Sequence, residues 1–300
     1  MTLVEVGPRD GFQAVDPFIP TDRKIALIKA LYAAGMRRIE VGSFVSATAL
    51  PQMADAEAVW SAACDLPGLD PQVLAPTLRQ VERAMAAGVD HVGFVLSVSE
   101  WHNLNNVRRM PLESVAEFAR IVDVVRAGVR LRVNVATAFD CPETGLVEED
   151  ATLALLDALV GLRPDAEFTL CDTTGRARPD HVRRLFSRAQ ERFPQAASWT
   201  FHGHDTYGVG VANVLAAYEA GVRTFDASIA GLGGCPFAPG ATGNVATEDV
   251  VWTFEGMGRR TGVDFDRLLP VAAEIVALPG AETGGRVRTA ISRRDACRAA

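Results

Sequence analysis

One junction recurs four times in the sequence, and it limits the folds that the chain can adopt. At each copy an alanine and a glycine end a helical pattern, and an apolar residue begins an extended one. Glycine readily adopts the left-handed backbone that ends a helix, so each copy predicts a helix followed by a strand. Strands separated by helices pair in parallel, because only a crossover returns the chain to the same end of the sheet. The copies are Ala34-Gly35-Met36, Ala87-Gly88-Val89, Ala127-Gly128-Val129 and Ala220-Gly221-Val222.

Short apolar runs alternate with longer helical patterns from one end of the chain to the other. Eight such runs in one unbroken alternation predict an α/β fold, a (β/α)8 TIM barrel over residues 1–262, with a doubly wound open sheet as the alternative. Residues 263–300 are predicted to form a short helical C-terminal extension that packs on the barrel. The candidate strands are 3–7, 37–43, 72–75, 91–97, 130–137, 167–171, 199–204 and 224–230.

Composition excludes several classes of protein. Of the 300 residues, 48% are hydrophobic and 22% are charged, which is enough apolar content for a large core and excludes disorder of the whole chain. The net charge of −7 argues against nucleic-acid binding, and no apolar run approaches the roughly 18 residues that cross a membrane. The five cysteines have no paired or zinc-type spacing, and a predicted strand begins at the N-terminus. We therefore expect a cytoplasmic protein with no membrane or nucleic-acid partner.

Two short motifs carry side chains that are suited to chemistry. In His202-Gly203-His204-Asp205 the histidines alternate on a predicted strand and so point to one face, as metal ligands or as a hydrogen-bonded pair. Arg9 and Asp10 follow the first strand, where barrel enzymes place catalytic groups, and an Asp-Gly turn is the alternative. In a closed barrel the eighth strand lies beside the first, so closure brings these two motifs toward one point.

A glycine-rich segment, Gly231 to Asn244, leaves the eighth predicted strand. Its glycines let the backbone approach a ligand closely, and a flexible loop is the alternative. Cys235 within it is a candidate acid/base thiol, although buried unreactive cysteine is common. The Asn244 side chain offers an oxygen, and with the aspartate and both histidines it makes a set of two nitrogens and two oxygens. This set suits Mg²⁺, Mn²⁺ or another first-row divalent ion.

Further carboxylates are expected at the same rim, on Glu40, Asp172, Glu248 and Asp249. Asp172 precedes a Thr-Thr-Gly sequence, so its alternative interpretation is a turn residue. Glu248 and Asp249 follow a threonine, where acidic residues also favour the N-terminus of a helix.

Six motifs together closely resemble the hydroxymethylglutaryl-CoA lyase family of the DRE-TIM metallolyases, over about residues 3 to 265. The glycine segment with its cysteine is specific to the lyase branch, whereas the Arg-Asp and His-x-His elements belong to the wider superfamily. The motifs are residues 4–11, Ser43-Phe44-Val45-Ser46, Pro51-Gln52-Met53, Cys171-Asp172-Thr173, residues 202–208, and residues 231–244 with 246–249.

The resemblance implies a metal-dependent acyl-CoA lyase of leucine catabolism, a homodimer. Such an enzyme cleaves 3-hydroxy-3-methylglutaryl-CoA, or a close 3-hydroxyacyl-CoA analogue, to acetyl-CoA and a keto acid such as acetoacetate by retro-Claisen chemistry. The implied metal is Mg²⁺ or Mn²⁺, with Zn²⁺ or Co²⁺ as alternatives, and its implied ligands are Asp10, His202, His204 and Asn244. Arg9 would stabilise the enolate, His202 and Asp10 would move protons, and Cys235 would protonate the departing acetyl-CoA enolate. The implied supporting residues are Glu40, Asp172 and Glu248.

Departures from the family pattern gather on the substrate side. Phe12-Gln13-Ala14 replaces Leu-Gln-Asn, Val41-Gly42 replaces a threonine pair, and Ala47-Thr48-Ala49 replaces Pro-Lys-Trp. Residues 99–106 lack the lysines of relatives, so His102 is expected to be a surface or substrate-loop residue. The phosphates of CoA are expected to meet backbone amides or two arginines, Arg108 and Arg109. These changes leave the acyl group open, a citramalyl-type thioester included.

Three other functions fit part of the pattern. A Claisen-condensing acyltransferase of the isopropylmalate or homocitrate synthase type shares both short motifs, but it usually carries a longer C-terminal region. A 4-hydroxy-2-oxoacid aldolase lacks the segment around Cys235. A non-catalytic barrel would have lost site residues, and here every expected position is filled.

Overall fold

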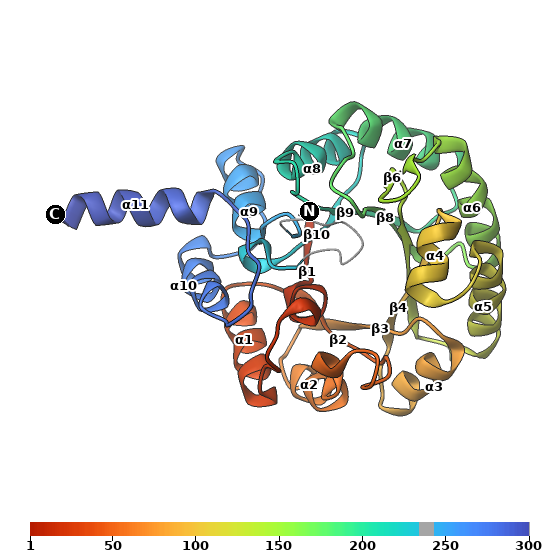
Figure 1. Ribbon diagram of the computed structural model, residues 1–300, viewed down its shortest axis with the longest axis horizontal. Helices are drawn as coiled ribbons and strands as arrows, with labels where there is room; N and C mark the ends of the chain where they lie inside the picture. The colour runs from red at the N-terminus through yellow and green to blue at the C-terminus, as the bar shows by residue number, and fades with distance from the viewer. Residues whose placement is uncertain (234–242, 300) are drawn as a thin grey trace.

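The computed structural model describes residues 1–233 and 243–299, with side chains up to residue 293. In this part of the chain eight parallel strands close into a barrel with helices on its outside (Figure 1). The order around the barrel is β1-β10-β9-β8-β5-β4-β3-β2. The predicted (β/α)8 barrel is confirmed, and the open sheet is excluded because β1 pairs with both β2 and β10. The barrel strands are β1 (Thr2–Glu5), β2 (Arg38–Ser43), β3 (Asp70–Leu74), β4 (His91–Ser97), β5 (Arg130–Ala136), β8 (Glu167–Asp172), β9 (Ser198–Gly203) and β10 (Thr224–Ala227).

Helices follow the barrel strands in chain order, and most of them cover the outside of the barrel. They are α1 (Thr21–Ala33), α2 (Ala56–Cys64), α3 (Leu78–Ala86), α4 (Glu100–Val107), α5 (Pro111–Val124), α6 (Glu149–Leu162), α7 (Pro179–Arg192), α8 (Gly210–Glu219), α9 (Thr247–Gly256), α10 (Phe265–Val276) and α11 (Val287–Ala299). A hairpin and four short helical turns complete the fold: β6 (Asp140–Cys141), β7 (Gly145–Leu146), η1 (Gly7–Gly11), η2 (Phe12–Ala14), η3 (Pro51–Met53) and η4 (Ile229–Gly231).

The four junction glycines adopt the backbone that the sequence predicts. Their φ angles are 103° at Gly35, 87° at Gly88, 91° at Gly128 and 100° at Gly221. At Gly35 the surrounding space also excludes any larger residue, because an added Cβ would lie 2.4 Å from the carbonyl oxygen of Gly262. Gly35, Gly88 and Gly221 follow the last residues of α1, α3 and α8, whereas Gly128 lies in a turn after α5 has ended at Val124, and each of the four leads the chain into the next barrel strand.

Barrel closure brings the ends of the first and last strands together. β1 and β10 are in register from Thr2 with Thr224 to Glu5 with Ala227. β10 is shorter than the predicted run 224–230, because the chain turns through η4 directly after the strand. The segments that follow β1 and β10 therefore leave neighbouring strands at the same end of the barrel.

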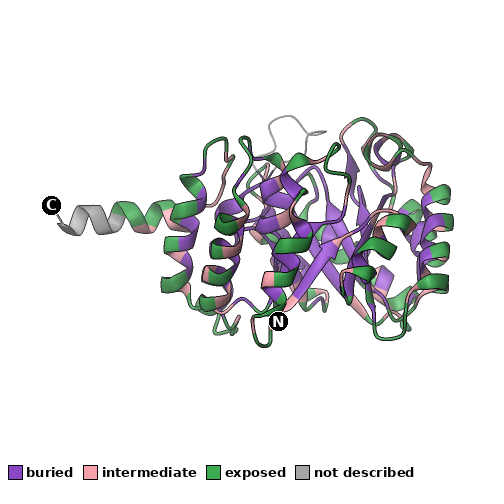
Figure 2. Cartoon of the chain, turned by 90° about the horizontal axis from the view of Figure 1, so that it is seen from below, coloured by how far each residue is buried: buried purple, intermediate pink, exposed green. Residues whose placement is uncertain are grey.

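The two layers of the fold differ in chemistry. Buried apolar residues of the strands and helices form the core, and Figure 2 shows buried residues along the strands and exposed ones on the outer faces of the helices. The barrel interior instead contains buried ion pairs, Arg38 with Glu167 and Arg132 with Asp226. Charged side chains are rarely buried unless they are paired, so these residues form a specific polar arrangement inside the barrel.

The two helices of the C-terminal segment pack differently. α10 packs against α1 and α9 through buried side chains that include Leu268 and Val271. α11 extends away from the barrel, and the Asp249 carboxylate accepts hydrogen bonds from the N–H groups of Arg286 and Val287 at its start (Figure 1). α10 therefore packs on the barrel as expected for the C-terminal extension, whereas most of α11 does not. The domain boundary at residue 262 stays a prediction. No helix of the described residues is both long and apolar enough to cross a membrane.

Candidate active site

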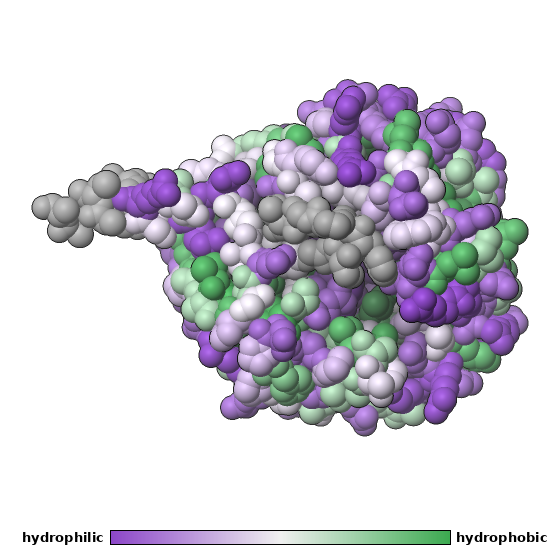
Figure 3. All heavy atoms as spheres, in the orientation of Figure 1, coloured by the Kyte–Doolittle hydropathy of each residue, from purple (hydrophilic) through white to green (hydrophobic). Residues whose placement is uncertain are grey.

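A cavity of about 810 Å³ opens at the end of the barrel where the parallel strands have their carboxyl termini. Figure 3 shows this face hollowed near the barrel axis, with hydrophilic and hydrophobic side chains around the hollow. The site residues predicted from the sequence that line the cavity are Arg9, Asp10, Glu40, His202 and His204. Barrel enzymes place their active sites at this end, so the cavity is the candidate active site.

One aspartate and two histidines meet in the cavity, as the sequence predicts. Asp10, His202 and His204 each offer a ligand atom, and these atoms all lie within 4.8 Å of one another. His202 lies near the end of β9 and His204 follows just past the strand, two residues later, so both rings point the same way, with centroids 5.1 Å apart. A single cation can therefore be contacted by all three side chains.

Hydrogen bonds fix the orientation of both imidazole rings. Nδ1 of His202 lies 2.9 Å from Oδ2 of Asp226, and Nδ1 of His204 lies 2.8 Å from the backbone oxygen of Asp172. A carbonyl oxygen only accepts hydrogen bonds, so Nδ1 of His204 carries the proton, and the carboxylate selects the same arrangement at His202. Both histidines thus leave Nε2 free to bind a metal.

Asn244 supplies the fourth group of the set. Its Nδ2 donates to Oδ2 of Asp10 at 2.8 Å and to the backbone oxygen of Leu232 at 3.2 Å. Its Oδ1 is buried and has no hydrogen-bond partner among the described residues. A buried acceptor without a partner is costly, and a cation held by the carboxylate and the histidines would satisfy it. The residues present therefore fit a divalent metal.

The ends of the glycine-rich segment hold Asn244 in place. At Gly243 φ is 99°, and an added Cβ would lie 2.1 Å from the carbonyl oxygens of both Gly231 and Gly233. The same residue accepts a hydrogen bond at its carbonyl oxygen from the N–H of Asp205, 3.1 Å away. Glycine is therefore required at this position for the segment to close beside β9. Cys235, the predicted acid/base thiol, lies outside the described residues.

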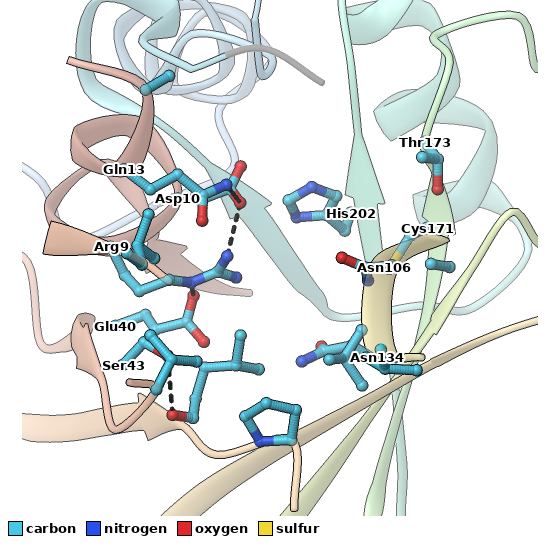
Figure 4. Close-up of a pocket in the computed structure, with 18 of the residues that line it drawn as sticks. Arg9, Asp10, Gln13, Glu40, Ser43, Asn106, Asn134, Cys171, Thr173 and His202 are labelled. Atoms are coloured by element: carbon cyan, nitrogen blue, oxygen red, sulfur yellow. Dashed lines mark hydrogen bonds and ion pairs between the residues drawn. The ribbon is translucent and has the colours of Figure 1, made fainter. Parts of the chain in front are cut away.

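Arg9 lies between two carboxylates on one wall of the cavity (Figure 4). Its Nε donates to Glu40 at 2.5 Å and its Nη1 donates to Oδ1 of Asp10 at 2.6 Å, while Gln13 donates to the same oxygen at 3.1 Å. η1 starts directly after β1, and this short turn aims the Arg9 and Asp10 side chains into the barrel mouth. The guanidinium is thus fixed in position next to the histidines, with His202 facing it across the cavity.

The charges in the site shift the pKa values of its groups. Burial opposes ionisation of Asp10, but Arg9 and the two histidines outweigh it and lower the pKa of its carboxyl. Burial also disfavours charge on His202, yet its hydrogen bond to Asp226 and the charge of that carboxylate raise its pKa. Burial and the neighbouring His202 lower the pKa of His204 to about 4. Near neutral pH Asp10 is therefore an anion and His204 a neutral ligand.

Two predicted supporting carboxylates point to neighbouring segments instead of to the cavity. The Asp172 carboxylate accepts from the N–H of Ala177 at 3.2 Å, and burial together with the charge of Asp140 raises its pKa to about 7. Glu248 accepts from the N–H of Ala230 at 3.0 Å and, like Asp249, lies in the first turn of α9. The contacts of Asp172 agree with its alternative interpretation as a turn residue. Those of Glu248 and Asp249 agree with acidic residues at the N-terminus of a helix.

Of the two positions expected for His102, the surface is excluded, whereas a place beside the substrate cavity agrees with the structure. The His102 ring is buried, lines the cavity, and lies 2.7 Å through Nδ1 from Oγ of Ser97. Burial lowers its pKa to about 4. Arg108 is exposed, whereas Arg109 donates to the backbone oxygen of Pro76 at 2.6 Å. Of the two arginines, Arg108 is thus the more available to a phosphate.

Sequence reasoning missed several residues near the histidines. Asp226, whose carboxylate orients His202, is the one charged residue of β10, and its partner Arg132 lies between apolar residues of β5. That isolation was a signal, because a charge inside a buried strand needs a partner. Gln13 and Asn134 also line the cavity.

Fold and site together define a (β/α)8 barrel with a candidate divalent-metal centre at its carboxyl mouth. The family model described as HMGL-like matches residues 1–275. A hydroxymethylglutaryl-CoA lyase from Pseudomonas mevalonii is 38% identical over 295 residues, which cover 98% of this chain and 97% of that protein. An (R)-citramalyl-CoA lyase from Chloroflexus aurantiacus is 37% identical over 291 residues, 93% of this chain and 91% of that protein. The chain belongs to the HMGL-like family, within the DRE-TIM metallolyases.

A solved structure agrees with this assignment. The structure of an HMG-CoA lyase from Acinetobacter baumannii in complex with coenzyme A and 3-methylmalate is 40% identical, with a TM-score of 0.89. The match covers 96% of this chain and 94% of that chain. The similarity therefore extends over the barrel and most of the C-terminal segment.

Proposed function

We propose that the protein is a carbon-carbon lyase that cleaves 3-hydroxy-3-methylglutaryl-CoA, or a close 3-hydroxyacyl-CoA analogue, to acetyl-CoA and a keto acid such as acetoacetate. The observation that carries the proposal is the meeting of Asp10, His202 and His204 in one cavity, with Arg9 beside them. Retro-Claisen cleavage needs a hydroxyl group to lose its proton and an enolate to be stabilised. The cavity has groups suited to both tasks.

We propose Mg²⁺ or Mn²⁺ as the metal, with Zn²⁺ or Co²⁺ as alternatives, held by the carboxylate of Asp10, Nε2 of His202 and His204, and Oδ1 of Asn244. When bound, a divalent cation lowers the pKa of the substrate hydroxyl and orients the substrate. The free Asn244 oxygen and the fixed rings support this set. The mixture of oxygen and nitrogen donors favours a first-row ion or Mg²⁺ over a thiolate-binding metal.

Arg9 is proposed to stabilise the thioester enolate. Its two carboxylate partners hold the guanidinium in a fixed position before substrate binds, so little reorganisation is needed as negative charge develops on the thioester oxygen. Glu40 supports Arg9 in this role through the 2.5 Å hydrogen bond to Nε. A lysine would have no planar fork with which to contact both carboxylates.

The proton steps are proposed to involve Asp10, His202 and Cys235. His202, whose Nδ1–H is held by Asp226 and whose Nε2 faces the metal position, is proposed to assist the proton transfer by keeping the substrate hydroxyl next to Asp10. Asp10 remains an anion beside it, and its carboxylate is proposed to accept the proton of the substrate hydroxyl. Cys235 is proposed to protonate the departing acetyl-CoA enolate, on the basis of the family motif that contains it.

The cavity is proposed to take a branched acyl group that also carries a polar end. Apolar side chains of Leu50, Leu74 and Val95 line it together with the amides of Asn106 and Asn134. Both 3-hydroxy-3-methylglutaryl-CoA and a citramalyl-type thioester have this combination of an alkyl group and a carboxylate. We also propose that backbone amides and the exposed Arg108 meet the phosphates of CoA.

Finer properties are proposed as well: a cytoplasmic location, a homodimer, and a place in leucine catabolism. Cys64, Cys141 and Cys171 are free thiols among the described residues, which suits a reducing compartment. Light scattering after size-exclusion chromatography tests the dimer, and a mass of one chain would contradict it.

The test of the function is a coupled assay for acetyl-CoA release from a panel of 3-hydroxyacyl-CoA thioesters, with and without a chelator. We expect release that stops on metal removal and returns with Mg²⁺ or Mn²⁺. Asp10→Asn should abolish turnover, while Asp123→Asn on the exposed face of α5 should keep it. Release unaffected by exhaustive metal removal would contradict the mechanism, and consumption of acetyl-CoA with a keto acid would indicate a synthase.

A further inference from the structure

We propose that Arg132, on β5, is a positioning residue that fixes Asp226 and, through it, the metal-facing ring of His202. The inference rests on the proposed function, because it concerns the same metal site. It assigns a task to a charge pair inside the barrel that the reaction itself does not require.

Asp226 joins the two residues directly. It lies on β10 opposite His202 of β9 in the strand register. Its Oδ2 accepts hydrogen bonds from Nδ1 of His202 at 2.9 Å and from Nη2 of Arg132 at 2.6 Å. The same oxygen accepts from both partners. If Arg132 is lost, the Asp226 carboxylate can move, and its hydrogen bond with His202 changes.

Arg132 reaches Asp226 across the interior of the barrel. In the barrel order β8 and β9 lie between β5 and β10, so the two residues are not on neighbouring strands. The Arg132 side chain is 1% exposed, and its Nε donates to Oγ1 of Thr169 at 2.8 Å. Glu167 lies 3.2 Å from the same nitrogen, and Arg38 donates two hydrogen bonds to Glu167. The guanidinium thus has one position, and it imposes one position on Asp226.

The position of Asp226 matters because His202 can turn about its Cβ–Cγ bond. With Nδ1–H held by the carboxylate, Nε2 faces Asp10 and His204 in the cavity. Without that acceptor the ring is free to exchange its two nitrogens between the metal and the barrel interior. Partners that orient metal-bound histidines typically contribute about 10-fold to 100-fold to metal affinity.

Positioning and simple electrostatics predict opposite results for this arginine. Removal of a buried positive charge near the site should, by Coulomb attraction alone, strengthen the binding of a cation. Loss of positioning should weaken it. The direction of the change in affinity therefore decides between the two roles of Arg132.

The experiment measures Mn²⁺ binding to the metal-free full-length protein, with electron paramagnetic resonance detecting unbound Mn²⁺. Arg132→Met should weaken binding by about 10-fold to 100-fold. Arg38→Met is the matched control, because Arg38 contacts the same Glu167 and does not contact Asp226. We expect it to change Mn²⁺ affinity by less than about threefold, and circular dichroism checks that each variant is folded.

A second pair of variants keeps the test decisive if the unpaired Asp226 prevents folding. Asp226→Asn still offers an oxygen to Nδ1–H of His202 and leaves no charge at position 226. In that background Arg132→Met should change Mn²⁺ affinity by less than about threefold, since the arginine acts through the carboxylate. A further tenfold loss in that background, or Mn²⁺ binding by Arg132→Met as tight as in the wild type, would overturn the inference. A wild-type protein that binds Mn²⁺ but cleaves no thioester would refute the proposed function and leave this inference standing.

Discussion

Glu5 provides a quantitative test of how the ends of the barrel are joined. It is fully buried, and its Oε1 accepts from the N–H groups of Gly7 at 2.8 Å and Ile229 at 2.9 Å, while Oε2 accepts from Oγ1 of Thr247 at 2.7 Å. One carboxyl group thereby connects η1, η4 and α9, the three segments around the candidate metal site. Burial, reinforced by the charge of Glu248, raises its pKa from 4.5 to about 7 against the effect of these hydrogen bonds.

The raised pKa sets a dependence of stability on pH. Below pH 4.5 the group is protonated in both the folded and the unfolded chain, so it imposes no ionisation cost. Above about pH 7 it is ionised in both states, and the folded chain bears the full cost of the buried charge. At 1.36 kcal/mol for each pKa unit, this cost is about 3 kcal/mol at pH 8 and is absent near pH 4. Glu5 therefore destabilises the fold progressively as the pH rises from 4.5 to 7.

Glu5→Gln removes this cost and can retain the contacts. The amide oxygen accepts from both N–H groups, and the amide nitrogen donates to Thr247, whose hydroxyl then acts as acceptor. Urea unfolding of the wild type and the variant at pH 5 and pH 8 measures the effect. Because part of the cost is already present at pH 5, the variant should gain about 2.5 kcal/mol relative to the wild type between these two values. Glu57→Gln, at an exposed position of α2, should show no such change. An equal difference at both pH values would refute the reasoning.

Three further predictions concern the site itself. Gly243→Ala places a Cβ against two carbonyl oxygens and should lower Mn²⁺ affinity at least about tenfold in isothermal titration. The control Gly256→Ala, whose Cβ would meet no atom within 4 Å, should leave the affinity unchanged. Arg9→Lys loses the planar contact with both carboxylates, so in steady-state assays kcat should fall by about 100-fold or more and KM should change by less than about threefold. A change in KM alone would contradict the role of Arg9 in stabilising the enolate. His204→Ala should weaken Mn²⁺ binding by more than about 100-fold with thermal unfolding little changed, and loss of the fold in place of the metal would indicate a structural histidine.

The sequence predicts the barrel because its local signals agree with the fold. The four junction glycines have positive φ and three of them end helices, and the spacing of the two histidines at the end of β9 places both rings on one side. Asp10 joins them because closure of β1 onto β10 follows from the barrel itself. Each of these inferences needs only a local backbone rule and one topological step.

The partners of buried charges could not be predicted in the same way. Arg132 meets Asp226 94 positions later in the chain, across a barrel interior whose registers decide which charges touch. The direction of a side chain at the rim depends on the turn that follows, which is why Asp172 faces Ala177. The burial of His102 was also not predictable, because α4 folds its ring back onto Ser97 of β4. These outcomes depend on packing between distant segments.

Anomalous diffraction from crystals of the protein soaked in Mn²⁺ tests the central claim most directly. We predict one strong peak in the barrel mouth, in contact with the carboxylate of Asp10, Nε2 of both His202 and His204, and Oδ1 of Asn244. A peak away from these atoms, or none at a concentration of Mn²⁺ that supports turnover, would contradict the account.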